Sequence, residues 1–217
     1  MKKSFSQYLL LPVALCAVLL GSCKKADPDQ WSHIMDSYLT NDSVAQLLLV
    51  MHTEGSNAYA EFFVKEDHEW KLIEQGPVFI GQNGLGKEKE GDRKTPVGEF
   101  SAYTAFGILS DPGTGLPYIL ATPSIYGCDD SCYYNQMIDT AVLHHKCHGE
   151  HIIDYNPEYN YGLAIDYNPD GIVGLGSCIY VHCKGKNPYT AGCVALDEDF
   201  MRTVLINSDE RLRISIH

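Results

Sequence analysis

The stretch that decides the fold reads Ser177-Cys-Ile-Tyr-Val-His-Cys183, then Lys184-Gly-Lys-Asn-Pro-Tyr-Thr-Ala-Gly192, and it closes on Cys193. Its first part alternates as a β-strand does, which puts Ile179, Val181 and Cys183 on one face and Cys178, Tyr180 and His182 on the other. Its second part is rich in turn-forming residues and predicts a loop. We expect the apolar face to pack on a core, so that His182 and Tyr180 turn toward an open groove.

The loop ends at Cys193, eleven positions after His182, and is expected to bring the cysteine back beside the histidine. A thiol is a good nucleophile only as the thiolate, and a nearby imidazole is the usual means of producing one. A glycine before the cysteine allows a close approach of substrate, and the amides of Gly192 and Cys193 could donate to an oxyanion. The spacing predicts Cys193 and His182 as a catalytic pair, although a structural histidine and a buried thiol would have the same spacing.

The rest of the chain predicts a mainly β fold with a few short helices. Two long stretches, 81–98 and 109–161, lack a regular pattern, and loops of that length usually build or cover a site. Asp67-His-Glu69 indicates a hairpin tip, and Asp197 suits the N-cap of a helix. The expected strands are 47–51, 58–64, 70–73, 78–80, 162–167, 177–183 and 211–216, and the expected helices are 31–39, a short one around 137–145 and one after residue 197.

The first residues indicate export. Lys2 and Lys3 precede an apolar run from Tyr8 to Leu20, and Leu20-Gly-Ser-Cys23 follows. This resembles the lipobox of bacterial lipoproteins, although an ordinary signal peptide is the alternative. We predict a lipoprotein signal peptide at 1–22, a tether with a short helix at 23–45 and a catalytic domain at 46–217. The protein is then anchored to a membrane through acylated Cys23 and faces the periplasm or the exterior of the cell envelope.

The charge balance excludes some partners. Without residues 1–22 the chain keeps 14 Lys+Arg against 28 Asp+Glu, a net charge of −14. So acidic a protein is not expected to bind nucleic acid or an anionic membrane surface.

The cysteines and histidines of the region 128–151 allow a disulfide or a metal site. An envelope location permits disulfides, and Cys128, Cys132 and Cys147 are the candidates, with their connectivity open. Cys178 and Cys183 lie about 16 Å apart in an extended strand, too far for a bridge, which tolerates about 7 Å. The spacing in His144-His-Lys-Cys-His-Gly-Glu-His151 matches no usual zinc pattern, so we predict no metal and no cofactor.

A family resemblance supports this interpretation. Thr190-Ala-Gly-Cys-Val-Ala-Leu196, preceded by Gly174-Leu-Gly-Ser-Cys-Ile-Tyr-Val-His182, resembles the catalytic segment of the YkuD-type L,D-transpeptidases. Upstream, Glu90-Gly-Asp-Arg-Lys-Thr-Pro-Val-Gly-Glu-Phe100 is similar to a second segment of one branch of that family. Smaller matches follow in the expected order, and the resemblance covers about 46–217. They are Cys128-Asp-Asp130, Tyr133-Tyr-Asn135, Asp139, Glu150-His151 and Asp166-Tyr-Asn168.

The resemblance implies a partly open β-sandwich whose groove holds the Cys–His site. Cys193 would attack a peptidoglycan stem peptide and form a thioester, and His182 would move the protons. Gly192, Thr190 and Tyr180 would serve the oxyanion or the substrate. An amine acceptor would give a crosslink or D-amino-acid exchange, and water would give carboxypeptidase action.

This chain departs from the better-known members of the family at four positions. Thr190 stands for a serine, Ala195 for an arginine, Cys183 for a glycine and Arg93 for a glycine. These departures leave transfer or hydrolysis open, and a non-catalytic cell-wall binding module is the alternative from another class. The oligomeric state is not indicated.

Overall fold

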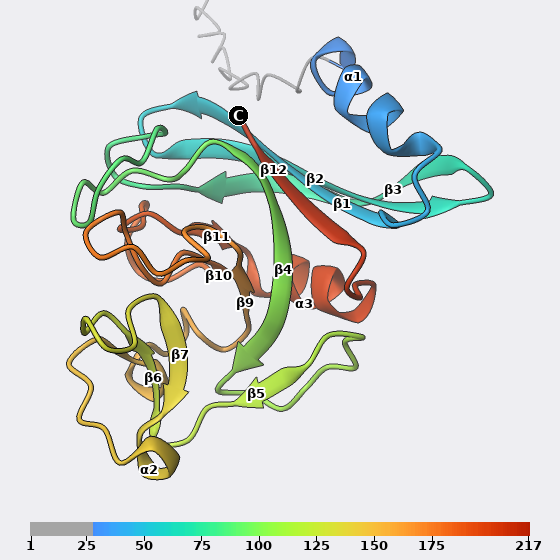
Figure 1. The fold of residues 1–217 in the computed structure, drawn as a ribbon. Coiled ribbons are helices and arrows are strands. Elements are labelled where there is room, and N and C mark those ends of the chain that lie inside the picture. Colours follow the sequence, from blue (N-terminus) through green and yellow to red (C-terminus); the bar gives the residue numbers. More distant parts are fainter. Residues whose placement is uncertain (1–27) are drawn as a thin grey trace, which may run out of the picture.

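A large β-sheet that curls back on itself forms the body of the protein. The computed structural model describes residues 28–217, so the predicted signal peptide and Cys23 lie outside the described residues. In sheet order the strands are β12 (Leu212–Ile216), β1 (Gln46–Glu54), β2 (Asn57–Glu66), β3 (Glu69–Phe79), β11 (Val194–Leu196), β10 (Tyr180–Cys183), β9 (Gly162–Ile165), β4 (Gly98–Gly107) and β5 (Tyr118–Leu120) (Figure 1). The predicted fold class, mainly β with a few short helices, is confirmed.

Strand β12 closes the curl. It pairs in parallel with β1 and antiparallel with β4, so the first and last parts of the sheet meet (Figure 1). The opposite junction is weak, because β3 and β11 pair only through Phe79 and Ala195. The sheet therefore opens beside β11, the strand that directly follows Cys193.

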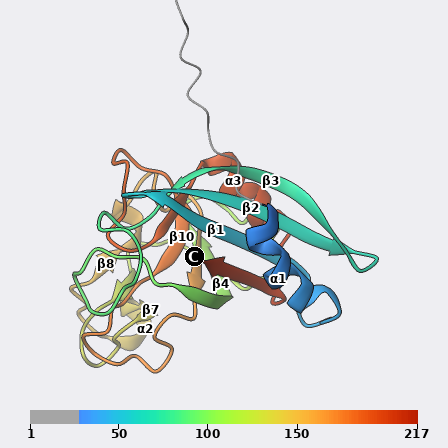
Figure 2. The ribbon, with the colours of Figure 1, turned by 90° about the horizontal axis from the view of Figure 1, so that it is seen from above.

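Alternation along β1 gives the sheet two apolar faces. Leu48 and Val50 point into the main core, whereas Leu47 and Leu49 point to the opposite face. Helix α1 (Pro28–Leu39) covers that opposite face through Ile34 (Figure 2). The helix predicted at 31–39 is thus confirmed, and it hides apolar surface that the sheet would otherwise expose to water.

Helix α3 (Glu198–Ile206) covers the other end of the main core. Phe200, Met201, Val204 and Leu205 are buried at helical spacing. Asp197 is the N-cap residue, as predicted, but its side chain makes no capping hydrogen bond and pairs with Lys184 Nζ at 3.0 Å. No helix in residues 28–217 is long and apolar enough to cross a bilayer.

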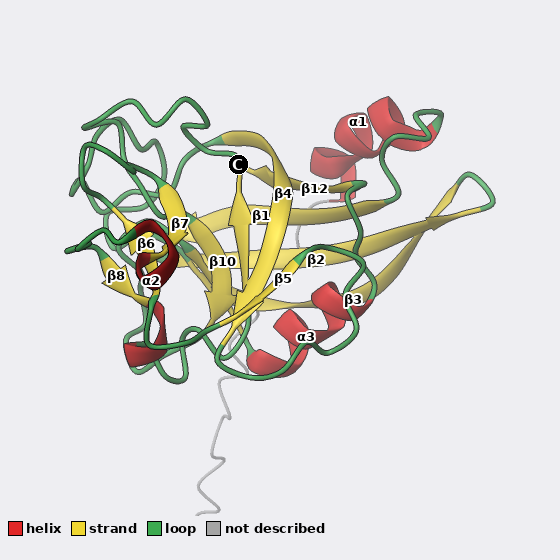
Figure 3. Ribbon diagram, turned by 60° about the horizontal axis from the view of Figure 1, so that its bottom comes forward, coloured by secondary structure: helices red, strands yellow, loops and turns green. Residues whose placement is uncertain are grey.

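The region 109–161, predicted to be irregular, contains a second, smaller sheet. Strand β6 (Ile125–Cys128) lies between β7 (Gln136–Asp139) and β8 (Glu150–His151). The helix predicted around 137–145 is shorter in the structure, where α2 spans only Thr140–Leu143. A 3-10 turn spans Ile152–Asp154. Figure 3 shows this small sheet beside the long loops at one end of the molecule.

The strand prediction needs correction at three points. The segments predicted separately at 70–73 and 78–80 belong largely to one strand, β3, and β4 was not predicted. The strand predicted from residue 177 begins only at Tyr180, because Cys178 has a φ of +54° and interrupts the extended backbone. The chain therefore bends just before the strand that carries the predicted histidine.

Candidate active site

His182 and Cys193 line the same cavity, which has a volume of about 300 Å³. Strands β10 and β11 run in parallel and pair His182 with Ala195. Because side chains two positions apart share a face, Cys193 projects to the same side of the sheet as Ala195 and His182. The opposite face of β10 bears Ile179, Val181 and Cys183, which lie in the main core as predicted.

The Cys193 thiol is held by backbone groups of the segment before and within β10. The amide of Tyr180 donates to Sγ at 3.3 Å, and Sγ donates to the carbonyl of Cys178 at 3.4 Å. Burial and, to a smaller extent, the carboxylate of Glu150 raise the pKa of the thiol, whereas the Tyr180 amide and the ammonium of Lys87 lower it, and the resulting pKa is about 12. The resting residue is thus a neutral thiol, which would have to lose its proton before it could act as a nucleophile.

The hydrogen bonds of His182 fix its tautomer. Nδ1 lies 2.7 Å from the carbonyl oxygen of Cys183, which can only accept, so Nδ1 carries the proton. Burial lowers the pKa of the imidazole, and Nε2 is left without a proton. The ring of Tyr159 packs edge-on against the imidazole, with the centroids 5.3 Å apart. His182 therefore rests in the form that can accept a proton.

Thr190 organises the turn before Cys193. Its hydroxyl donates to the carbonyl of Cys193 at 2.7 Å and accepts from the amide of Gly192 at 3.0 Å. The hydroxyl of Thr95, from the second resemblance segment, reaches the same carbonyl at 3.1 Å. This corrects the expectation for Gly192, whose amide is engaged by Thr190 and is not free to donate to an oxyanion. Thr190 itself lines the cavity, and its hydroxyl holds the turn.

Gly192 has a steric role that the sequence did not predict. Its φ is +151°, and a Cβ built there would lie 3.0 Å from the carbonyl oxygen of Lys94. Only glycine adopts this backbone readily while the loop 81–98 packs so closely. The two sequence segments that carry the resemblance thus meet at this residue.

Tyr180 does not line the cavity, contrary to the prediction. It is 3% exposed, and its ring packs against Phe106 and Tyr159 with centroid distances of 4.9 and 5.8 Å. The side chain is on the predicted face of the strand but lies beneath the site. Its contribution to the site is the backbone amide that reaches Cys193.

Glu150 is a site residue whose role was missed from the sequence. It lies on β8 and accepts a hydrogen bond from the Tyr159 hydroxyl at 2.5 Å. Burial raises the pKa of its carboxyl to about 7, with smaller contributions from Glu90 and Asp129. Its place in the resemblance was the only signal, since no local pattern shows that β8 packs beside Cys193.

A second cavity, of about 280 Å³, meets the first at Cys193. Both are lined by Cys193, Glu150, Tyr155 and Ala191. The second cavity adds the ionisable side chains of Lys87, Glu90, Asp129 and His148 and the hydroxyl of Ser177. Cys193, which is 6% exposed, therefore lies between the two cavities.

Lys87 is the cation whose charge lowers the pKa of the Cys193 thiol. Its Nζ pairs with Asp92 at 3.0 Å, and both side chains are buried. Amides of the same loop and Lys87 hold the pKa of Asp92 well below its usual range, although its burial acts in the other direction. Lys184 donates to Pro77 O and Asp197 and does not line either cavity.

A scan of protein-family models matches residues 58–216 to the L,D-transpeptidase catalytic domain called YkuD. This match spans most of the chain and includes both cavities. The chain belongs to the YkuD family. The predicted family and fold class are thereby confirmed.

Solved structures give weaker similarity to this YkuD domain. The helical cell shape determining protein Pgp2 of Campylobacter jejuni, as its K307A mutant, has 17% identity and a TM-score of 0.47, with 84% of this chain and 54% of that chain covered. Bd1075 of Bdellovibrio bacteriovorus has 17% identity and a TM-score of 0.42, with coverage of 80% and 48%. This chain thus spans about half the length of those proteins. A search of curated proteins found no match.

Two departures from the better-known YkuD sequences meet in the first cavity. Ala195, which stands for an arginine, and Arg93, which stands for a glycine, both line it. Arg93 adopts a φ of +58°, and its Nη1 donates to Gln82 Oε1 at 2.6 Å. A guanidinium is thus present at this cavity although the usual one is absent.

Proposed function

We propose that the protein is a cysteine-dependent L,D-transpeptidase that acts on peptidoglycan stem peptides through a thioester. The observation that carries the proposal is the position of Cys193 at the junction of two cavities, one of which it shares with His182. A transferase must hold a donor and then admit an acceptor at the same sulfur, and two approaches to one thiol suit that sequence.

The first half-reaction follows from the resting protonation states. Nε2 of His182 takes the proton of the Cys193 thiol as Sγ attacks the carbonyl carbon of the donor. The tetrahedral intermediate collapses when the carbon–nitrogen bond breaks, and Nε2 returns the proton to the leaving amine. The thioester remains on Cys193. With the amide of Gly192 engaged by Thr190, the amide of Cys193 is the oxyanion donor that we propose.

The second half-reaction reverses the proton path. His182 takes a proton from an incoming amine, the amine attacks the thioester, and Cys193 leaves as a thiolate that regains its proton. Since the leaving and the attacking amine both need His182, we assign both to the first cavity. Arg93 in that cavity would pair with the carboxylate of the departing D-alanine.

The donor stem then occupies the second cavity. Its wall combines Glu90, Asp129 and Glu150 with His148. Acidic groups of this kind suit a stem residue that carries an ammonium on its side chain, such as diaminopimelate. The hydroxyl of Ser177, which donates to Glu90 at 2.7 Å, orients one of these carboxylates.

Purified protein with disaccharide tetrapeptide, with and without a D-amino acid, tests the proposal. Mass spectrometry should detect an exchanged tetrapeptide, and Cys193→Ala and His182→Ala should abolish it. Cys132→Ser, at an exposed cysteine, is the matched control. Tripeptide alone in both incubations would mean hydrolysis at the same site. A folded protein that yields neither exchanged tetrapeptide nor tripeptide, and that forms no covalent adduct at Cys193, would be a non-catalytic binding module.

We also propose that the protein is exported and anchored to a membrane through acylated Cys23. The motif Leu20-Gly-Ser-Cys23 after an apolar run supports this proposal. Labelling of growing cells with a radioactive fatty acid should mark the wild type but not Cys23→Ala. Label that persists in the variant would contradict acylation at this residue.

A further inference from the structure

Two buried thiols outside the catalytic pair lie unusually close together. Cys128 ends β6, and Cys147 lies in the loop between α2 and β8. The distance between their Sγ atoms is 2.7 Å, and the residues are 0% and 7% exposed. Atoms that only touch prefer separations of about 3.5–4.0 Å, whereas the sulfurs of a disulfide lie about 2.05 Å apart. These two sulfurs are therefore closer than a non-bonded contact favours.

The backbone sets this approach. Strands β6 and β8 pair antiparallel, with Gly127 opposite Glu150, so the segments that carry both cysteines are held side by side. A Cβ on Gly149 would lie 2.1 Å from the carbonyl oxygen of Gly127, which shows how closely the two segments pack. The amide of Gly149 also donates to Cys147 Sγ at 3.3 Å. Both thiols thus face each other because of the sheet register.

We propose that Cys128 and Cys147 form a disulfide in the exported protein. Two S–H bonds break and one S–S bond forms, and the two electrons and two protons pass to an external protein disulfide, which becomes a dithiol. The proposal rests on the export proposed above, since such oxidants act outside the cytoplasm. The bond closes the loop from 128 to 147 and fixes β8, which carries Glu150 beside Cys193.

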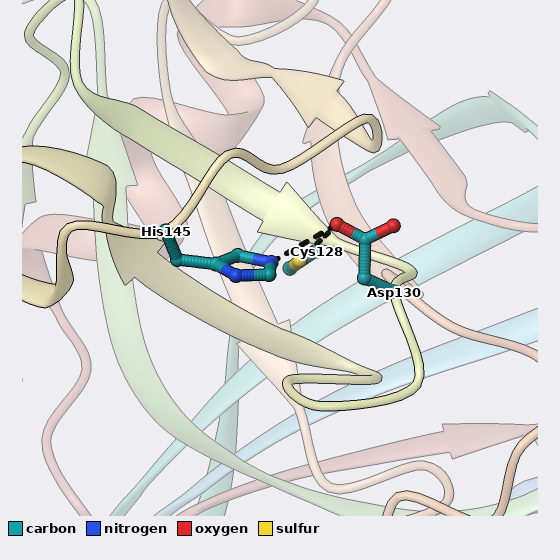
Figure 4. A group of neighbouring side chains, drawn as sticks. All are labelled: Cys128, Asp130 and His145. Atoms are coloured by element: carbon teal, nitrogen blue, oxygen red, sulfur yellow. Dashed lines mark hydrogen bonds and ion pairs between the residues drawn. The ribbon is translucent and has the colours of Figure 1, made fainter.

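A metal is the competing occupant of this place. One ligand atom each from Cys128, Asp130 and His145 lies within 4.8 Å of the others, and Figure 4 shows His145 directed at Asp130. Sulfurs that share a tetrahedral zinc, with bonds of about 2.3 Å, would lie about 3.8 Å apart. The two sulfurs here are nearer than that. The Asp130 carboxylate is moreover already paired with His145 at 3.0 Å and His148 at 3.5 Å. The geometry favours the disulfide.

Differential alkylation of the full chain tests the bond. The protein is expressed with its leader, purified without reductant, and denatured in N-ethylmaleimide. It is then reduced, and the freed thiols are labelled with iodoacetamide. Peptide mapping should find the second label on Cys128 and Cys147 and the first label on Cys132, Cys178, Cys183 and Cys193. The variant Cys128→Ser should move Cys147 to the first label, whereas Cys132→Ser should change nothing at either residue. Because labelling takes place in denaturant, a poorly folded variant is still informative.

Three results would overturn the proposal. The first is N-ethylmaleimide on both cysteines even after equilibration of the folded protein with oxidised glutathione. The second is a bridge from Cys132 to either partner. The third is about one zinc per chain that a chelator removes, with both thiols then free. A pair that is reduced on purification but oxidises in glutathione contradicts export and leaves the pairing itself supported. Activity at Cys193 is read separately, so a failure of the proposed reaction is not confused with a failure of the bond.

Discussion

The backbone amide of Tyr180 donates a hydrogen bond to Sγ of Cys193 across 3.3 Å, from the strand that also carries His182. An amide donor stabilises sulfur more as negative charge develops on it. One strand therefore supplies both a donor to the nucleophile and the base that we propose for it. Burial opposes the thiolate, and in the proposed mechanism His182 removes the proton.

We expect His182→Ala to slow acylation of Cys193 by a carbapenem about 10²–10⁴-fold, the usual worth of general acid–base catalysis. Adduct formation is followed by intact mass at equal protein concentration. His68→Ala, at the exposed hairpin tip, is the matched control and should react as the wild type does. Equal rates for the two variants would remove His182 from the mechanism.

Glu150 should make folding stability depend on pH. Burial raises the pKa of its carboxyl from an ordinary 4.5 to about 7, so the folded protein binds this proton more tightly than the unfolded chain does. Its contribution is therefore fully present below pH 4.5 and is lost as the pH rises through 7. The loss amounts to about 3 kcal/mol.

The substitution Glu150→Gln keeps an acceptor for the Tyr159 hydroxyl and removes the titration. The free energy of unfolding, from urea titrations, should be similar in variant and wild type near pH 4.5 and should favour the variant by about 3 kcal/mol near pH 8. Glu88→Gln, at an exposed carboxylate, is the control. A constant difference between variant and wild type across this range would show that Glu150 does not titrate in the folded protein as stated.

Arg93 should select donors with a free C-terminal carboxylate. A hydrogen bond to a charged group contributes about 1.5–3 kcal/mol, so Arg93→Gln should raise KM for tetrapeptide about 10–100-fold and leave kcat nearly unchanged. For the same tetrapeptide with a C-terminal amide, KM should differ little between the wild type and the variant. Lys89→Gln removes an exposed cation from the same loop and serves as the control. An equal rise in KM for the acid and the amide substrates would contradict the role assigned to Arg93.

Alternation was sufficient to predict which face of β10 packs into the main core, because Ile179, Val181 and Cys183 lie there as expected. Alternation did not predict how deeply each side chain is buried. Tyr180 and His182 share a face, yet Tyr180 lies beneath the cavity because Phe106 and Tyr159 close over its ring. How far a side chain lies from water depends on neighbours that are distant in sequence.

The elements that were missed depend on pairing between distant segments. Strand β4 mixes glycine, alanine and threonine with aromatic residues, a weak local signal, and becomes a strand because β9 and β12 flank it. Strand β8 has two residues and exists only because β6 pairs with it. The role of Glu150 follows from that pairing, so a local pattern could not indicate it.

The hydroxyl of Thr190 should be essential for the shape of the nucleophile loop. Thr190→Val keeps the volume but leaves the buried Gly192 amide unpaired, at a cost of about 1–3 kcal/mol, whereas the Cys193 carbonyl keeps its hydrogen bond from Thr95. Thr190→Ser restores the hydroxyl and should recover both stability and turnover. Thr203→Val, which removes a hydroxyl bonded to Asp199 O on the surface of α3, is the control.

Turnover separates a positioning role from a structural one. It is measured at a temperature where circular dichroism finds every variant folded, together with the rate of carbapenem trapping. A misplaced Cys193 should lower kcat and the trapping rate in Thr190→Val while KM stays close to the wild-type value, since the cavity walls are otherwise unchanged. A variant that is less stable but traps and turns over normally would limit Thr190 to folding. Loss of the hydrogen bond between the Gly192 amide and Thr190 would in that case not impair the reaction at Cys193.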